Sequence, residues 1–289
     1  MTSLQAAEVV GLQDVLALVE GSSRTGKPGL APDVRGWLAS PEQGLTATVE
    51  PVRGAEATAE ALGRLAPSGL TVLATVHADH ACWAEIVRHG HDHGHGVGDP
   101  ETCVIGLSYG LSGAVSRLIW LRAPLVPGLG ADATATVPRS EADTPEAAPA
   151  GRPILERYFA DLMSSRFNEA ASHFTVNTLY SHPPYAGGTE RVLFEGRDAL
   201  RRGFAELRGP SPARQIVTDF WQQGKRMFVE GVIEGIPNGG TFFSTGHISP
   251  DGEIARYVAF YSGARIPAST AWTAGPPAAH QKPVLPNLN

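Results

Sequence analysis

Two stretches of the chain, Gly113-Ala-Val-Ser-Arg117 and Gly252-Glu-Ile-Ala-Arg256, follow one pattern of glycine, apolar residue and arginine at an offset of 139 residues. A second pair, Trp83-Ala-Glu85 and Phe228-Val-Glu230, matches at an offset of 145. In each copy the tryptophan or phenylalanine stands two residues before a glutamate. These matches indicate that residues 54–127 and 196–267 are two versions of one sequence.

A third set of matches lies between the other two in offset. At an offset of 142, Leu62 matches Phe204 and Leu65 matches Leu207. An offset that drifts is expected when loops change length between equivalent helices and strands. Solenoid repeats are shorter, at roughly 20 to 50 residues. The pattern therefore predicts a duplicated small domain.

Length and composition agree with two soluble domains. A chain of 289 residues with 42% hydrophobic residues can bury two cores. The net charge of −6 disfavours nucleic acid as a partner. The sequence contains no run of 18 apolar residues, and it starts without a basic segment followed by an apolar one, so we expect a cytoplasmic protein without a membrane partner. Two cysteines, Cys82 and Cys103, are expected to be buried thiols.

Composition also suggests where the domains end. We predict a first domain over residues 1–127, a linker rich in alanine and proline over 128–152, a second domain over 153–267, and a proline-rich tail over 268–289. The tail is either disordered or an extended strap over one domain.

The second copy has the clearer element pattern. Apolar residues at helical spacing follow Pro153, and shorter helices are expected at 167–174 and 196–204. Strands are expected at 176–181, 215–222, 226–234, 241–249 and 253–261. The first copy repeats this order, with helices at 12–20 and 56–65 and strands at 71–76, 82–88, 102–109 and 115–122. The prediction is an α+β fold in which two tandem cone-shaped units each wrap a curved antiparallel sheet round helices.

Four segments of the second copy carry a resemblance to a known superfamily. They are Tyr158-Phe-Ala-Asp-Leu162, Leu179-Tyr-Ser-His-Pro-Pro184, Glu195-Gly-Arg-Asp-Ala-Leu200 and the strand that starts at Gly252. In this order they resemble the nuclear-transport-factor-like superfamily, which includes ketosteroid isomerases, scytalone dehydratases and SnoaL-like polyketide cyclases. The resemblance covers residues 153–267 well and residues 10–127 weakly, so it implies a degenerate first copy. It also implies that the two units pair through their sheets as an intramolecular pseudo-dimer, with a further homodimer as an option.

The ketosteroid-isomerase pattern can be carried over to three positions. The resemblance implies that Tyr158 donates a hydrogen bond to a developing enolate oxygen and that His182, directly before Pro183, moves the proton. Where that family has a second oxyanion donor, an acid, this chain has Ser244, which is a weaker donor. An ordinary histidine pKa of about 6.5 lets His182 accept a proton near neutral pH. His182 capping the turn before the two prolines, and Tyr158 as a plain core residue, are the structural alternatives.

Other polar residues of the second copy are candidates on their position alone. Glu230 lies mid-strand, where a carboxylate is costly unless it is paired or hydrated. It is a candidate acid–base residue, with a salt bridge to Arg226 or Arg256 as the alternative. His247 and Tyr261 are candidate substrate-binding residues on strands whose facing the sequence leaves open.

The first copy lacks these groups, with Leu16 at the position matched to Tyr158 and Ser40 at that matched to His182.

The alternating histidines of residues 89–95 could hold a transition metal, but a solvated hairpin tip is the simpler interpretation, and no metal site or cofactor is expected.

The leading functional hypothesis is a SnoaL-like enzyme of secondary metabolism. It would catalyse cofactor-free acid–base isomerisation, cyclisation or dehydration of a small apolar carbonyl-bearing, polyketide-like substrate, as an isomerase, cyclase or lyase. An epoxide-opening polyether cyclase is an alternative among enzymes. A non-catalytic protein that binds a hydrophobic ligand or a partner is the alternative outside them.

Overall fold

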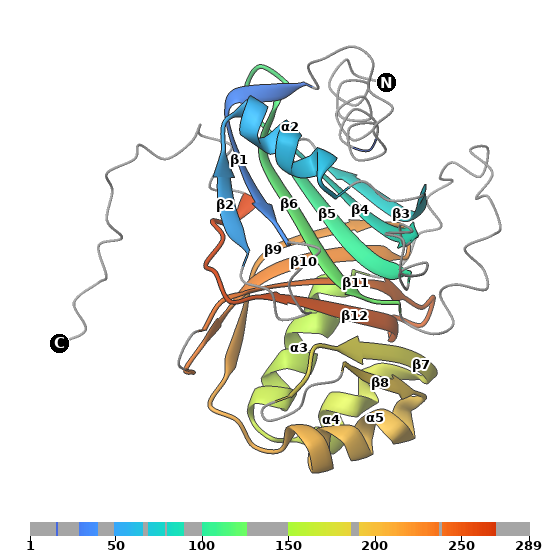
Figure 1. The fold of residues 1–289 in the computed structure, drawn as a ribbon. Coiled ribbons are helices and arrows are strands. Elements are labelled where there is room, and N and C mark those ends of the chain that lie inside the picture. The colour runs from blue at the N-terminus through green and yellow to red at the C-terminus, as the bar shows by residue number, and fades with distance from the viewer. Residues whose placement is uncertain are drawn as a thin grey trace.

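The computed structural model describes Leu16 and residues 29–39, 49–65, 69–78, 80–89, 100–125, 150–185, 191–236 and 239–269. Within these residues the chain forms two six-stranded mixed sheets that face each other, with helices on the outer side of each sheet (Figure 1). The predicted α+β class with two tandem units is confirmed. The predicted domain boundaries stay predictions, because residues 126–149 and 270–289 lie outside the described part of the chain.

The first unit has one sheet and one fully described helix. Its strands are β1 (Leu30–Leu38), β2 (Glu50–Arg53), β3 (Gly69–Ala78), β4 (Ala81–His89), β5 (Glu101–Tyr109) and β6 (Val115–Pro124), in the order β2-β1-β6-β5-β4-β3. Helix α2 (Ala55–Gly63) covers the outer face of this sheet (Figure 1). Of the helix predicted at 12–20, only Leu16 is described, and it is helical and buried.

The second unit repeats this topology. Its strands are β7 (Phe174–His182), β8 (Val192–Glu195), β9 (Arg214–Gln223), β10 (Arg226–Glu234), β11 (Thr241–Ile248) and β12 (Ile254–Ser262), in the order β8-β7-β12-β11-β10-β9. Its helices are α3 (Gly151–Met163), α4 (Phe167–Ser172), α5 (Arg197–Gly203) and the π-helical turn η1 (Phe204–Arg208).

Strands β1, β2 and β8 were not predicted. In β1 the residues Pro32, Asp33 and Gly36 suppress the strand signal. The proline is tolerated because the ladder between β1 and β6 is irregular between Leu30 and Arg35. Strands β2 and β8 are four-residue edge strands, too short for a period of two to be recognised.

Equivalent glycines mark the duplication in the backbone itself. Gly54 precedes α2 with φ 89° and ψ 152°, and Gly196 precedes α5 with φ 85° and ψ 151°. This conformation is almost confined to glycine, because a Cβ atom would clash with the backbone. Both copies therefore enter the helix after the edge strand through the same turn.

The inner faces of the two sheets pack on each other through an apolar cluster to which both units contribute. Trp83 of β4 lies at its centre, with its ring centroid 5.4 Å from Trp221, 6.0 Å from Phe228 and 5.6 Å from Phe243. Gly106 opposes Trp83 on β5, and a Cβ atom there would come within 2.3 Å of the indole ring. The indole thus lies flat on the backbone of its own sheet and presents its other face to the second unit.

Two buried ion pairs cross this interface in a reciprocal arrangement. Arg117 of the first unit binds Glu230 of the second through two hydrogen bonds of 2.8 and 2.9 Å. The equivalent residues pair in the opposite sense, since Arg256 of the second unit binds Glu85 of the first with both terminal nitrogens. The glycine–arginine and aromatic–glutamate motifs of the sequence therefore encode the two halves of one interface.

The two pairs differ in their surroundings. Beside Glu85 the cross-strand neighbour is Ala74, whereas Glu230 stands opposite Asp219. Burial acts to raise the pKa of Glu85, but the charge and hydrogen bonds of Arg256 outweigh it and hold that pKa below its usual range. For Glu230, burial together with the Asp219 carboxylate raises the pKa despite Arg117. Glu230 also accepts a hydrogen bond from the backbone N–H of Ser269, where the predicted tail begins.

Removing one partner of such a pair leaves a buried charge without compensation. We expect Arg117→Ala to lower the free energy of unfolding by about 3–5 kcal/mol, and the double variant Arg117→Met/Glu230→Leu to recover most of that loss. Urea denaturation of the full chain measures both. Arg64→Ala, which removes an exposed pair with Glu60, is the control and should cost roughly 0–1 kcal/mol. A loss as small as the control's for Arg117→Ala would contradict the role given to the pair.

Candidate functional site

A cavity of about 330 Å³ lies on the outer side of the second sheet, between β7, β10–β12 and the helical layer. This volume is near the lower end of the range for small-molecule sites, roughly 300–1,000 Å³. Its wall is mainly aromatic and aliphatic, with a few polar side chains. The polar and aromatic residues that line it are Tyr180, His182, Tyr185, Arg208, Ser211, Gln215, Phe242, Tyr257, Phe260 and Tyr261.

His182 is the last residue of β7, and it is half-buried on the cavity wall. Its Nδ1 lies 2.7 Å from the carbonyl oxygen of Pro183. A carbonyl only accepts, so Nδ1 carries the hydrogen and Nε2 keeps a lone pair. Burial lowers the pKa of His182 to about 4, with Arg191 and Arg208 adding to the effect and the Pro183 carbonyl opposing it. At neutral pH the ring is an uncharged acceptor.

Aromatic rings hold the imidazole in place. The Tyr180 ring is stacked with it at 6.1 Å and an interplanar angle of 4°, and the Tyr185 ring at 4.8 Å and 24°. The dipeptide Pro183-Pro184 ends the strand and turns the chain, which brings Tyr185 back over the ring. His182 therefore lies on the wall of a pocket, and the rings of Tyr180 and Tyr185 fix the orientation of its imidazole.

Tyr158 lies one layer behind this wall. It is fully buried among the rings of Phe159, Phe174, Phe204 and Tyr257, and it is not among the lining residues. Its hydroxyl is 3.1 Å from that of Tyr180, which does line the cavity. Burial raises the pKa of both tyrosines well above the usual value, so both keep their protons. Tyr158 therefore touches the cavity wall from behind, through the hydroxyl of Tyr180 and the ring of Tyr257.

Ser244 and Tyr261 occupy different depths of the site. Ser244 is buried, and its hydroxyl donates a hydrogen bond of 2.7 Å to the Tyr257 oxygen. Tyr257 lines the cavity, so Ser244 orients a lining hydroxyl and does not itself contact the space. Tyr261, half-buried on β12, is a lining residue as expected for a substrate-binding role.

Glu230 and His247 lie on the other face of the sheet. Glu230 shares the inner face with Phe228 and is bound by Arg117, as described above. His247 is close enough to Arg256 and Glu85 for both charges to act on it, and burial first and Arg256 second lower its pKa to about 4. Neither residue lines the cavity, so the structure does not bring them together with His182.

Several polar lining residues were not singled out from the sequence, among them Arg208, Gln215 and Tyr185. Arg208 ends η1, Gln215 lies near the start of β9, and Tyr185 follows the two prolines. Arg208 and Tyr185 stand in segments with turn-like composition, and Gln215 begins the predicted strand 215–222, for which the sequence does not show which face meets a cavity. Only the tertiary fold brings these segments to the mouth of one cavity.

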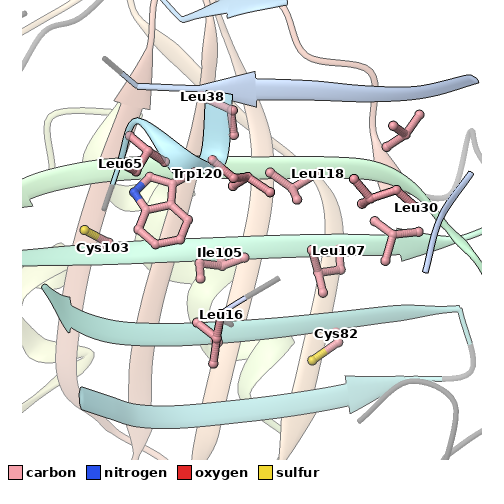
Figure 2. Close-up of a cluster of buried hydrophobic side chains, with 14 of the residues drawn as sticks. Leu16, Leu30, Leu38, Leu65, Cys82, Cys103, Ile105, Leu107, Leu118 and Trp120 are labelled. Carbon is pink, nitrogen blue, oxygen red and sulfur yellow. The ribbon is translucent and has the colours of Figure 1, made fainter. Parts of the chain in front are cut away.

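The first unit fills the corresponding space with its own side chains. The strand pairings of the two sheets show which positions are equivalent. Trp120 corresponds to Ala259 of the second unit, and Leu118 corresponds to Tyr257. Figure 2 shows the Trp120 indole inside the first core near Leu65, Cys103 and Ile105. Cys82 and Cys103 are buried free thiols there, as predicted.

A cluster of three charged side chains lies at the edge of the first unit's core. Glu101 accepts hydrogen bonds from Arg88 and Arg122. In the second unit the positions of Glu101, Arg88 and Arg122 are held by Gly240, Ile233 and Tyr261, respectively. Arg88 also donates to the Leu65 carbonyl oxygen. The described part of the first unit therefore offers a packed core and an ionic rim where the second unit has a cavity and its mouth.

The first-copy match to His182 needs a correction. In the first sheet Arg35 pairs with Arg117, and in the second sheet Leu179 pairs with the equivalent Arg256, so Arg35 and Leu179 occupy equivalent positions. Three residues further along each strand, the equivalent of His182 is Leu38 and not Ser40. The segment from this position to the helix-entry glycine is two residues longer in the first copy, from 38 to 54 against 182 to 196, which the sequence comparison could not locate. The first copy still has no proton-handling group at this position.

The described residues contain no cluster of three or more histidines, cysteines or carboxylates placed to bind a metal ion. Of the histidine tract at 89–95, only His89 is described, and its Nε2 lies 3.0 Å from the Thr71 hydroxyl. No helix in the described ranges is long and apolar enough to cross a membrane.

No protein-family model matches the chain, and no curated protein matches it either. Among solved structures it is similar to an NTF2-like protein of unknown function from Cytophaga hutchinsonii, with 13% identity, a TM-score of 0.31, and coverage of 39% of this chain and 90% of that one. A protein assigned as a ketosteroid isomerase from Kribbella flavida matches with 19% identity, a TM-score of 0.32, and coverage of 45% and 91%.

A third match is SalBIII, an epoxide hydrolase/cyclase-like enzyme of pyran ring formation in the polyether salinomycin, with 21% identity, a TM-score of 0.32, and coverage of 38% and 89%. Each of these matches covers less than half of this chain.

The environment of His182 sets a titration that can be measured directly. Because burial and two guanidinium groups disfavour the imidazolium form, we expect the ring to stay neutral as the pH falls and to protonate near pH 4. Titration of the histidine Cε1–H resonances by NMR, with His182→Gln to assign the signal, measures this pKa. A midpoint near the ordinary value of about 6.5 would show that the ring is hydrated and not enclosed as described.

The difference at position 259 predicts how the cavity can be filled. In the series Ala259→Val, Ala259→Leu and Ala259→Trp we expect affinity for a hydrophobic dye to fall with side-chain volume, because the largest member copies Trp120 of the first unit. Overpacking costs about 1–3 kcal/mol, so the melting temperature of each variant is measured alongside. Dye affinity independent of volume at position 259 would place the binding site elsewhere.

Proposed function

We propose that this protein is a cofactor-free enzyme that moves a proton on a small apolar carbonyl compound in the cavity of its second unit. The reaction classes are isomerisation, cyclisation and dehydration, as in the SnoaL-like and ketosteroid-isomerase-like enzymes that residues 153–267 resemble. The observation that carries the proposal is His182. Its Nδ1 hydrogen is donated to the Pro183 carbonyl oxygen, and burial keeps Nε2 unprotonated, so a ring with a free lone pair lies on the wall of an apolar cavity.

His182 has the properties that a general base needs here. The ring remains unprotonated at neutral pH, and the Pro183 carbonyl can stabilise the positive charge that forms when Nε2 takes a proton. The flanking rings of Tyr180 and Tyr185 restrict its orientation. A fixed base in a largely apolar site avoids the reorganisation that water would require.

The tyrosine hydroxyls supply hydrogen bonds for the oxygen of the reacting carbonyl. Tyr257 is oriented by Ser244, and Tyr180 is linked to Tyr158, so two lining hydroxyls are each held by a partner behind them. In this assignment Tyr158 and Ser244 are positioning residues. Glu230 and His247 take no part, because they belong to the interface between the units.

Deuterium exchange tests the proposal without knowledge of the natural substrate. The full chain is incubated in D₂O with a panel of apolar cyclic ketones such as tetralone, and exchange at the carbon next to the carbonyl is followed by NMR. We expect catalysed exchange by the unmodified protein, and a loss of about 10²- to 10⁴-fold for His182→Ala, because the base is absent.

Two further variants separate chemistry from folding. Ser181→Ala, adjacent on β7, removes a hydroxyl that interacts with Arg191 and Val192 but does not line the cavity, and it serves as the matched control for a local disturbance. Tyr158→Phe should reduce exchange less than His182→Ala. Ketone binding by the unmodified protein without any exchange would favour the non-catalytic binding protein instead.

A further inference from the structure

Arg208 is the cation of the cavity wall. It is half-buried at the end of η1, and one of its terminal nitrogens donates to the carbonyl oxygens of Leu162 and Gly209 at 3.3 and 3.1 Å. Among the described residues, no carboxylate lies within ion-pair distance of its guanidinium. A guanidinium has five N–H donors, so two weak contacts from one nitrogen leave most of its capacity for other partners.

The rest of the described wall is also without negative charge. None of its lining residues is aspartate or glutamate, and its tyrosines keep their protons. Among the described residues, the buried arginines each pair with a carboxylate, as Arg117 does with Glu230 and Arg256 with Glu85. Half-buried Arg191 has no carboxylate partner there, but it donates to the Ser181 hydroxyl and the Ala259 carbonyl oxygen. An arginine that faces a mostly apolar space without a carboxylate is costly unless a ligand supplies the negative charge.

Two further polar groups point to a ligand in the same place. The side-chain oxygen of Gln215 is buried and has no hydrogen-bond partner among the described residues. The Tyr185 hydroxyl, although close to Tyr180, meets no partner in hydrogen-bonding geometry there. Both side chains line the cavity together with Arg208. Buried polar atoms are nearly always satisfied, so these groups are best explained as contacts for a bound molecule.

The aromatic wall restricts the shape of that molecule. The rings of Tyr180 and Tyr257 are nearly parallel at 5.3 Å and 15°, and the His182 ring continues the stack beside Tyr180. Tyr180 and Tyr257 are almost fully buried and stack on each other, so the half-buried rings of Tyr185 and Tyr261 present more of their surface to the cavity. Such rings favour a ligand that carries a flat ring system of its own.

We propose that the cavity binds a planar organic acid, a carboxylate or an acidic enol, whose anionic oxygen is bound by Arg208 and whose ring system packs on the half-buried rings of Tyr185 and Tyr261. Gln215 accepts a hydrogen bond from a hydroxyl group of the same molecule, and Tyr185 donates one. This inference deepens the proposed function by naming the charge of its substrate. It rests on the same site but not on His182, because the charge is present before any proton moves.

A pair of probes that differ only in charge tests the inference. Binding of naphthoate and of its neutral isostere naphthamide to the full chain is measured by isothermal titration calorimetry at neutral pH. We expect naphthoate to bind at least about tenfold more tightly, because charge-assisted hydrogen bonds are the stronger kind. Arg208→Gln should abolish this preference, and Arg208→Lys should keep part of it, since lysine retains the charge but not the planar fork.

Arg214→Gln is the matched control, because Arg214 is an exposed cation close in sequence on β9 that does not line the cavity. It should leave the preference for naphthoate unchanged. Equal binding of the two probes, no binding of either by the folded protein, or a preference that persists in Arg208→Gln would each overturn the inference. If Arg208→Gln fails to fold, the comparison of the two probes on the unmodified protein and on Arg208→Lys still decides the question.

The outcome is separable from that of the proposed function. Naphthoate preference without ketone exchange would support an acid-binding cavity and refute the proton-transfer proposal. Ketone exchange that depends on His182, with no preference for naphthoate, would do the reverse.

Discussion

The packing of one sheet face on the other is the constraint on which the rest of the structure depends. Each sheet has two faces, and the inner faces are committed to each other through Trp83 and the reciprocal Arg117–Glu230 and Arg256–Glu85 pairs. Because successive side chains of a strand point to opposite faces, this commitment leaves only the outer face of each sheet for a cavity. The side chains of β10, β11 and β12 that point inward contribute to the interface, and those that point outward contribute to the second core or to the cavity wall.

The duplication kept the interface and let the outer faces diverge. Arginine, glutamate and the bulky aromatic that precedes it recur in both copies because each unit needs the partner's complementary group. No such reciprocity acts on the outer faces. There the first unit has Trp120 and the Arg88–Glu101–Arg122 cluster, and the second has Ala259 and an open, mostly aromatic cavity. One unit thus serves mainly as the sheet that covers the other's inner face.

In the second unit the cavity combines an uncharged base with an unmatched cation. The two are compatible because Arg208 and Arg191 help to keep His182 neutral, while a bound anion would offset their charge as the imidazole takes up a proton. Binding of an acidic ligand and proton transfer by His182 would therefore reinforce each other. The hydroxyl pairs Tyr158–Tyr180 and Ser244–Tyr257 connect this wall to the core that holds it in place.

The sequence by itself determined the duplication, the α+β class and most of the strands, and it selected His182 as a candidate, because these depend on local periodicity, turn residues and a histidine next to a proline. It also showed that Glu230 shares a strand face with Phe228 and Val232. Only the tertiary structure decided that this face meets Arg117 rather than a substrate, since the partner lies 113 residues away and the alternation of a strand is the same for a cavity as for an interface. For the same reason Arg208, Gln215 and Tyr185 could not be found from the sequence. Arg208 and Tyr185 lie in segments without a hydrophobic period, Gln215 begins a strand whose facing the sequence leaves open, and only long-range folding brings the three around one cavity.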